Sequence, residues 1–210
     1  MNSSPVLSLD RKKNLSKNLG VHMRPNLAQS KYMKNTELIS TGKPSKWVER
    51  FSGLIKRSDP ILDLAAGRGR HTHYFMGREH PVIAVDKDVS YLTQLENPLL
   101  LPVQVDLETR HPWPFKKDAF AGIVVTNYLH RPLFNDLVNS LAVEGLLIYE
   151  TFARGNEKFG RPSNPNYLLA PGELLSMAMH SLHIIAYEDL TVQKPKLARV
   201  QRICARKTKN

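Results

Sequence analysis

The sequence is poor in cysteine and in long apolar runs. Its one cysteine among 210 residues, Cys204, excludes a disulfide framework and any zinc site made of paired cysteines. Its apolar stretches, such as residues 120–125, are strand-sized and far shorter than the roughly 18–20 residues that span a bilayer. The first 25 residues lack the continuous apolar segment of a secretory signal. We therefore expect no membrane partner and a cytoplasmic location.

Positive charge dominates, and it is concentrated at the N-terminus. Lys and Arg number 30 against 19 Asp and Glu, a net charge of +11, and residues 1–43 hold eight basic and two acidic side chains. That segment has neither helical nor strand periodicity, and its apolar surface is too small to offset its ordering entropy. We therefore predict a basic, disordered tail over residues 1–43. A solvated tail, a tail that binds RNA and a mitochondrial transit peptide all fit this composition.

From residue 44 onward, short apolar runs alternate with helix-like segments. The runs are nearly unbroken, which is typical of strands buried on both faces of a parallel sheet. Strands are expected at residues 61–64, 81–85, 101–105, 120–126, 145–151, 182–190 and 197–206. Helices are expected at residues 45–55, 69–78, 88–95, 131–142 and 171–181, and none between 106 and 119. The pattern predicts an α/β, Rossmann-like sheet of seven mostly parallel strands, with helices on both faces and a C-terminal antiparallel hairpin.

One turn has the features of a ligand site. Residues 61–70 read Ile-Leu-Asp-Leu-Ala-Ala-Gly-Arg-Gly-Arg, so a buried strand ends in a turn of small residues that opens a helix. Small residues let a ligand lie against the backbone, and open α/β sheets bind ligands at the carboxyl ends of their strands. A dinucleotide fingerprint is excluded because Thr72 stands at its third glycine. The Gly-Lys-Ser/Thr of a phosphate loop is also missing.

This turn resembles motif I of the class I S-adenosylmethionine-dependent methyltransferases, with Ala65 at the position of that family's first glycine. Three further motifs follow in order along the chain, and the predicted C-terminal hairpin is typical of the same family. The sequence is most similar to the small methyltransferases of the tellurite-resistance type, with residues 44–207 as the methyltransferase domain. The resemblance implies S-adenosylmethionine as the cofactor.

The resemblance also implies which residues hold this cofactor. An acidic residue at the position of Asp86 binds both ribose hydroxyls in the family, and the position of Asp106 or Leu107 meets the adenine. The loop that contains Asn127 lies under the methionine portion, and Asp63 orients the glycine turn. The implied cofactor-binding residues are Asp63, Ala65, Gly67, Gly69, Asp86, Lys87, Asp106, Leu107 and Asn127.

Polar residues after the fourth and fifth expected strands mark an acceptor side. His130 and Arg131 follow the fourth strand, Glu150 ends the fifth, and Arg161 lies in a long loop with glycine and proline that we interpret as a substrate lid. A guanidinium group binds oxyanions bidentately, and His130 or Glu150 is a candidate general base. We therefore expect His130, Arg131, Glu150 and Arg161 to position the acceptor.

These features predict a methyltransferase acting on a small molecule, because the domain is minimal and has no separate recognition domain. An RNA or protein methyltransferase guided by the basic surface is one alternative, and a non-catalytic cofactor-binding scaffold is another. No metal is expected. His71 and His73 are two residues apart, so they do not face each other on a helix.

Overall fold

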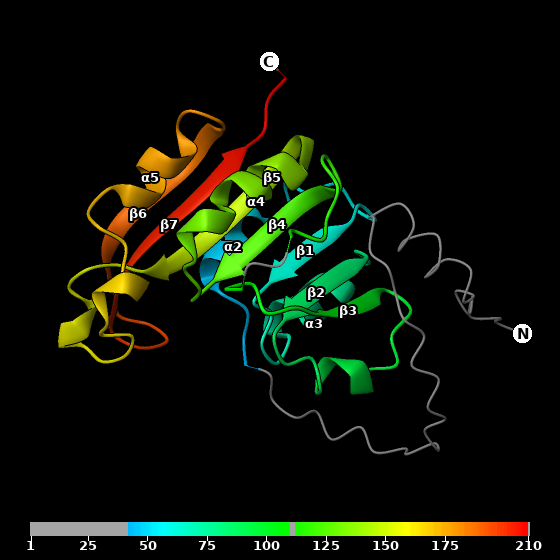
Figure 1. Ribbon diagram of the computed structural model, residues 1–210, viewed down its shortest axis with the longest axis horizontal. Coiled ribbons are helices and arrows are strands. Elements are labelled where there is room, and N and C mark those ends of the chain that lie inside the picture. The colour runs from blue at the N-terminus through cyan, green and yellow to red at the C-terminus, as the bar shows by residue number, and fades with distance from the viewer. Residues whose placement is uncertain (1–41, 110–111, 210) are drawn as a thin grey trace, which may run out of the picture.

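A seven-stranded sheet forms the centre of the molecule (Figure 1). The structure is a computed structural model and describes residues 42–109 and 112–209. Of the predicted tail over residues 1–43, all but Gly42 and Lys43 lie outside this range. The strands are β1 (Ile61–Leu64), β2 (Val82–Asp86), β3 (Leu100–Gln104), β4 (Phe120–Thr126), β5 (Leu141–Phe152), β6 (His183–Val192) and β7 (Ala198–Arg206).

The strand order is β3-β2-β1-β4-β5-β7-β6. The first five strands pair in parallel, whereas β7 is antiparallel to both β5 and β6. The predicted fold class is therefore confirmed. β5 starts at Leu141, earlier than expected, and the register shifts between Phe120 and Gly122 on β4. Gly145 permits this irregular start, because a Cβ there would lie 2.8 Å from the carbonyl oxygen of Ala142.

Helices cover both faces of the sheet. The described α-helices are α2 (Lys46–Ser52), α3 (Arg70–Met76), α4 (Phe134–Ser140) and α5 (Glu173–Ala178). Buried residues of α4 and α5 pack in one hydrophobic cluster with the sheet, and those of α2 and α3 pack in the other. In Figure 1, α4 lies in front of the strands and α2 behind them.

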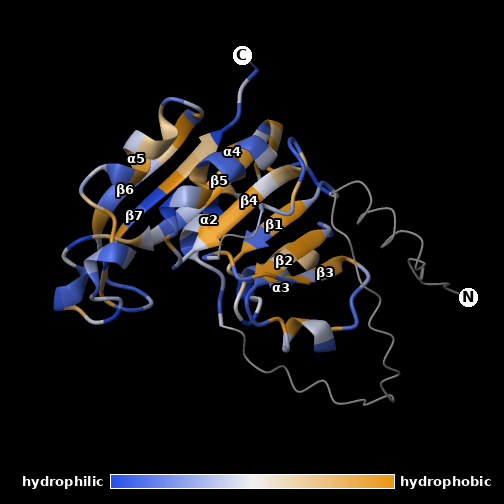
Figure 2. Cartoon of the chain, in the orientation of Figure 1, coloured by the Kyte–Doolittle hydropathy of each residue, from blue (hydrophilic) through white to orange (hydrophobic). Residues whose placement is uncertain are grey.

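Alternate residues of the central strands feed these two clusters. On β5, Leu147 and Tyr149 belong to the cluster under α4, while Leu146 and Ile148 belong to the cluster under α2. All four are buried, which explains the unbroken apolar run in the sequence. Figure 2 shows the same property as largely orange central strands.

One predicted helix is wrong. Residues 88–95 contain only a 3-10 turn, η1 (Leu92–Gln94). Side chains compete with helical hydrogen bonding here, because an Asp88 carboxylate oxygen accepts the N–H of Ser90 at 2.9 Å and the Thr93 hydroxyl donates to the Ser90 carbonyl at 3.0 Å. The other four predicted helices exist but are shorter. The described part of residues 106–119 contains no helix, as predicted.

Candidate functional site

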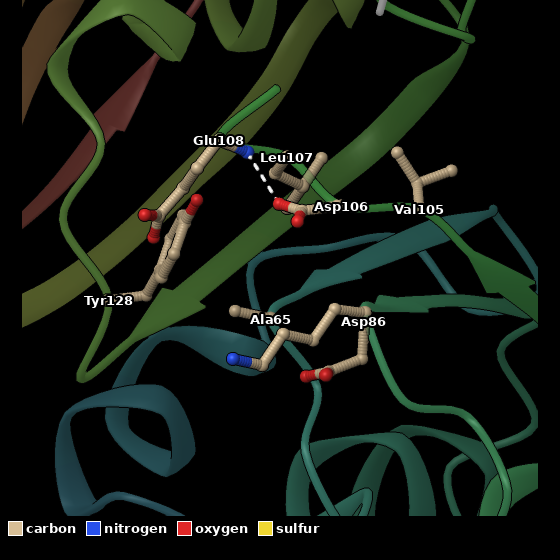
Figure 3. A pocket seen from close by; sticks show the side chains of 8 residues that line it. Ala65, Asp86, Val105, Asp106, Leu107, Glu108 and Tyr128 are labelled. Atoms are coloured by element: carbon tan, nitrogen blue, oxygen red, sulfur yellow. Dashed lines mark hydrogen bonds between the residues drawn. The ribbon is translucent and has the colours of Figure 1, made fainter.

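A cavity of about 300 Å³ opens at the carboxyl ends of the parallel strands (Figure 3). It collects the segments that follow β1, β2, β3 and β4, although these are far apart in the sequence. Its lining residues are Ala65, Asp86, Lys87, Val105, Asp106, Leu107, Glu108 and Tyr128. Five of them were predicted from the sequence as cofactor contacts, so the structure brings these five together in one cavity.

The turn after β1 uses left-handed backbone at three positions. Ala65, Gly67 and Gly69 have φ angles of 53°, 55° and 80°. A Cβ at Gly67 would meet no atom within 4 Å, whereas one at Gly69 would lie 2.6 Å from the Leu92 side chain. Gly69 is thus favoured by its left-handed φ and by its close packing against η1, and a side chain at Gly67 would meet open space. Neither glycine is among the cavity's lining residues.

Asp86 joins this turn to the end of β2. One of its carboxylate oxygens accepts the Gly67 N–H at 2.8 Å, and the other accepts the Asp88 N–H at 3.1 Å. An ionised carboxylate offers about four acceptor positions. Two therefore remain for donors from a ligand in the cavity.

Asp63 lies beneath the turn and outside the cavity lining. Its side chain is buried, and one of its oxygens accepts the Thr72 hydroxyl at 2.6 Å. Burial raises the pKa of Asp63 to about 6, although the hydrogen bonds from Thr72 act in the opposite direction. Asp63 therefore connects β1 to the first turn of α3, and the structure favours a role in holding the turn.

Tyr128 and Glu108 extend the cavity beyond the predicted residues. Figure 3 shows the Tyr128 ring beside the Glu108 side chain on the cavity wall. The Tyr128 hydroxyl is buried and has no hydrogen-bond partner among the described residues. Burial, followed by the charges of Glu108, Asp106 and Asp86, raises the pKa of Tyr128 above its usual range. In the sequence, the only indication that Glu108 lies at the cavity is its position two residues after the predicted contact Asp106.

Asn127 turns the chain at the end of β4. It has a φ of 56°, and its N–H donates to the carbonyl of Glu150 at 2.9 Å. Its side chain is exposed and is not among those lining the cavity. The backbone of Asn127 therefore shapes the rim, and a side-chain contact to the cofactor remains a prediction.

A polar network lies at the same edge of the sheet, where α2 begins. The Ser45 hydroxyl donates to Glu150 at 2.7 Å, and the Ser45 N–H donates to His71 Nε2 at 3.1 Å. Arg202 also donates to Glu150, at 3.3 Å. Burial lowers the pKa of His71 to about 3, so this ring is a neutral acceptor. Sequence reasoning missed this network, because its members come from distant elements.

Arg131 was predicted to position the acceptor, but its guanidinium is already paired within the protein. Its guanidinium forms a bidentate pair with Glu173 and also donates to the carbonyls of Asn166 and Leu168, at 2.8 and 3.1 Å. The predicted oxyanion-binding fork is thus occupied by a carboxylate of the protein. These contacts favour a structural role that ties α5 to the end of β4.

His130 and Arg161 lie in two different places. His130 lines a second hollow of about 170 Å³, together with Asp106, Trp113 and Asp136. Arg161 is exposed on the loop between β5 and α5. Among the described residues, no hydrogen bond or ion pair joins His130, Glu150 and Arg161, so their convergence on an acceptor remains a prediction.

The described residues offer neither a metal site nor a membrane span. No group of three His, Cys, Asp or Glu side chains in residues 42–109 and 112–209 is placed to hold a metal ion. Over the same ranges, no helix is both long and apolar enough to cross a membrane.

Comparison with known proteins places the fold. No protein-family model matches the sequence, and no curated protein matches it. Among solved structures, TehB from Haemophilus influenzae superposes with a TM-score of 0.62 at 16% identity, over 77% of this chain and 61% of that chain. A 1,6-didemethyltoxoflavin-N1-methyltransferase from Burkholderia thailandensis, solved with S-adenosylhomocysteine, gives 0.58 at 18% identity, over 78% and 77%.

The chain therefore has the Rossmann-like fold of S-adenosylmethionine-dependent methyltransferases and resembles the TehB type. It spans about three fifths of the TehB chain. The [4+2]-cyclase SpnF also shares the fold, with a TM-score of 0.62 at 12% identity over 78% of this chain and 79% of that chain. Since a cyclase and methyltransferases share one fold, the reaction has to be argued from the site.

Proposed function

We propose that this protein is an S-adenosylmethionine-dependent methyltransferase acting on a small molecule. The convergence of Ala65, Asp86, Lys87, Asp106 and Leu107 on one cavity carries the proposal. The sequence resemblance selected these residues from three separate segments, at the ends of β1, β2 and β3, and the fold brings them to one edge of the sheet. The 1,6-didemethyltoxoflavin-N1-methyltransferase among the structural neighbours supports a small acceptor on this fold.

The cavity fits the chemistry of this cofactor. The free acceptor positions of Asp86 suit the two hydroxyl groups of a ribose. Val105, Leu107 and the Tyr128 ring offer apolar and aromatic surface for a flat base. When bound, the cofactor supplies a methyl group on a good leaving group. The chain then has to hold the acceptor in line and exclude water.

His130, Glu150 and Arg161 remain our candidates for positioning the acceptor. Each carboxylate oxygen of Glu150 accepts one hydrogen bond, from Ser45 or from Arg202, so acceptor positions remain for a donor group. Arg131 is omitted because Glu173 occupies its guanidinium. A general base is needed only for an acceptor that arrives protonated, and His130 is then the candidate.

Calorimetry with S-adenosylmethionine tests the cofactor site. Asp86→Ala should weaken binding about 10- to 150-fold, because it removes hydrogen bonds to a charged group, worth about 1.5–3 kcal/mol. Asp88→Ala is the matched control. It removes the same charge from a position two residues after Asp86, and Asp88 does not line the cavity. Wild-type affinity in Asp86→Ala would move the ribose site elsewhere. Loss of binding in both would indicate collapse of the loop.

The acceptor class needs a separate test. Methyl-labelled cofactor should be incubated with the protein and cell extract, and the extract then fractionated into small molecules, RNA and protein. Label in the small-molecule fraction is the expected result. Label in RNA would support the second candidate, an RNA methyltransferase, which the exposed cations Lys158, Arg161, Lys194 and Lys196 favour. Cofactor binding without label in any fraction would favour the scaffold alternative.

A further inference from the structure

The loop between β5 and α5 is a pinned platform, which differs from the lid expected from the sequence. At its base, Ala153 and Leu169 form a parallel bridge. Inside it, the buried Asn156 side chain donates to the Pro162 carbonyl at 3.1 Å and accepts the Arg199 N–H at 3.2 Å. Arg131 holds the carbonyls of Asn166 and Leu168, where the loop returns to its base. The loop is therefore fixed against β7 and is suited to presenting side chains.

Exposed cations gather on this platform and on the turn between β6 and β7. Lys158, Arg161, Lys194 and Lys196 are all exposed. The turn lies against the loop, because Lys196 Nζ is 3.7 Å from the position that a Gly160 Cβ would occupy. Figures 1 and 2 show the two segments side by side and mainly hydrophilic. The surface formed by residues 154–167 and 193–197 is called the loop surface below.

These cations are mostly uncompensated. Glu157 is the only acidic residue in the two segments. Its carboxylate accepts the Gly155 N–H at 2.8 Å and lies beside Lys158. Within the described residues, Arg161, Lys194 and Lys196 form no ion pair. The loop surface therefore carries positive charge that a partner can neutralise.

Two exposed aromatic side chains lie on the same loop. Phe159 is 37% exposed and Tyr167 is 47% exposed, and they are the only aromatic residues among the large hydrophobic side chains exposed in the described chain. An exposed aromatic face stacks on nucleic-acid bases, whereas an acidic peptide or an anionic lipid headgroup offers no comparable flat ring. Aromatic faces among cations are the combination that single-stranded nucleic acids require.

We infer that the loop surface binds single-stranded nucleic acid, with Arg161, Lys194 and Lys196 contacting phosphates and Phe159 and Tyr167 stacking on bases. RNA and DNA share this chemistry. The loop follows β5 on the carboxyl side of the sheet, the side on which the cavity lies. The inference does not depend on methyl transfer, because it rests only on charge, exposure and the pinned loop.

Fluorescence anisotropy tests whether the loop surface binds single-stranded nucleic acid. The full chain is titrated into labelled 12-nucleotide oligo(U) and oligo(dT) between 50 and 200 mM salt. Each phosphate contact on a single strand contributes about −0.7 to the slope of log K against log salt. Arg161→Gln/Lys196→Gln should therefore make the slope shallower by about 1.4 and weaken binding. Lys56→Gln/Lys117→Gln is the matched control, since both lysines are exposed near the amino ends of β1 and β4. It should leave the slope unchanged.

The stacking role of Phe159 and Tyr167 has its own test. Tyr167→Ala and Phe159→Ala should each weaken oligonucleotide binding at least fivefold at constant salt slope, because stacking is not ionic. Tyr167→Leu, which keeps apolar bulk without a π face, should weaken it as well. An effect of the control pair equal to that of the Arg161/Lys196 pair would overturn the inference. So would unchanged affinity in the aromatic variants, or equally tight binding of polyglutamate, which has no bases.

Discussion

Asp63 is the most informative position for a stability measurement. Its buried carboxyl has a native pKa of about 6, against 3.8 in an unfolded chain. Between these values the native protein holds a proton that the unfolded chain has lost. The free energy of unfolding therefore falls as pH rises from about 4 to 6 and stays lower above. The total loss of unfolding free energy is about 3 kcal/mol, because each tenfold change in proton affinity corresponds to about 1.4 kcal/mol.

The perturbation is Asp63→Asn. The asparagine carbonyl oxygen can still accept the Thr72 hydroxyl, which donates to Asp63 at 2.6 Å, and the amide does not titrate. We expect the variant to gain stability relative to the wild type as pH rises. The difference between their unfolding free energies should grow by about 2.4 kcal/mol from pH 4 to pH 8.

The assay is urea denaturation of both proteins across this pH range. Taking the difference cancels every other titrating group. Glu96→Gln is the control, because it removes one carboxylate from an exposed position. A flat difference for Asp63→Asn, or one that shrinks as pH rises, would refute the reasoning. A constant offset would instead report the cost of an unpartnered amide N–H.

Two further predictions concern stability. Ala65 has a left-handed φ of 53°, so Ala65→Gly should stabilise the protein by about 0.5–1 kcal/mol in urea denaturation. Ala66→Gly, without such strain, should destabilise it, and a shift of both variants in the same direction would contradict this. Arg131→Ala and Glu173→Ala should show a coupling energy of about 1 kcal/mol in a double-mutant cycle. Loss of turnover in Arg131→Ala alone, at unchanged stability, would return Arg131 to the acceptor site.

The sequence determined the sheet and the edge that carries the site. Strands buried on both faces must be apolar along their whole length, so they are visible without a structure. Small residues are needed wherever a strand turns sharply into a helix, so the turn at Gly67 and Gly69 is visible too. The family resemblance implied the role of Asp86, and its place at the end of β2 puts it at the edge where the carboxyl ends of the parallel strands meet.

Tertiary structure alone decided which polar side chains pair with which. Arg131 is a possible oxyanion ligand in sequence, but Glu173 lies 42 residues away and reaches it only because α5 packs beside the end of β4. Glu150 meets Ser45 and Arg202 across separations of 105 and 52 residues. Such pairings depend on how the helices and strands pack, and local sequence periodicity does not predict this packing. For the same reason the loop after β5 resembled a lid in the sequence, whereas the buried Asn156 fixes it against β7.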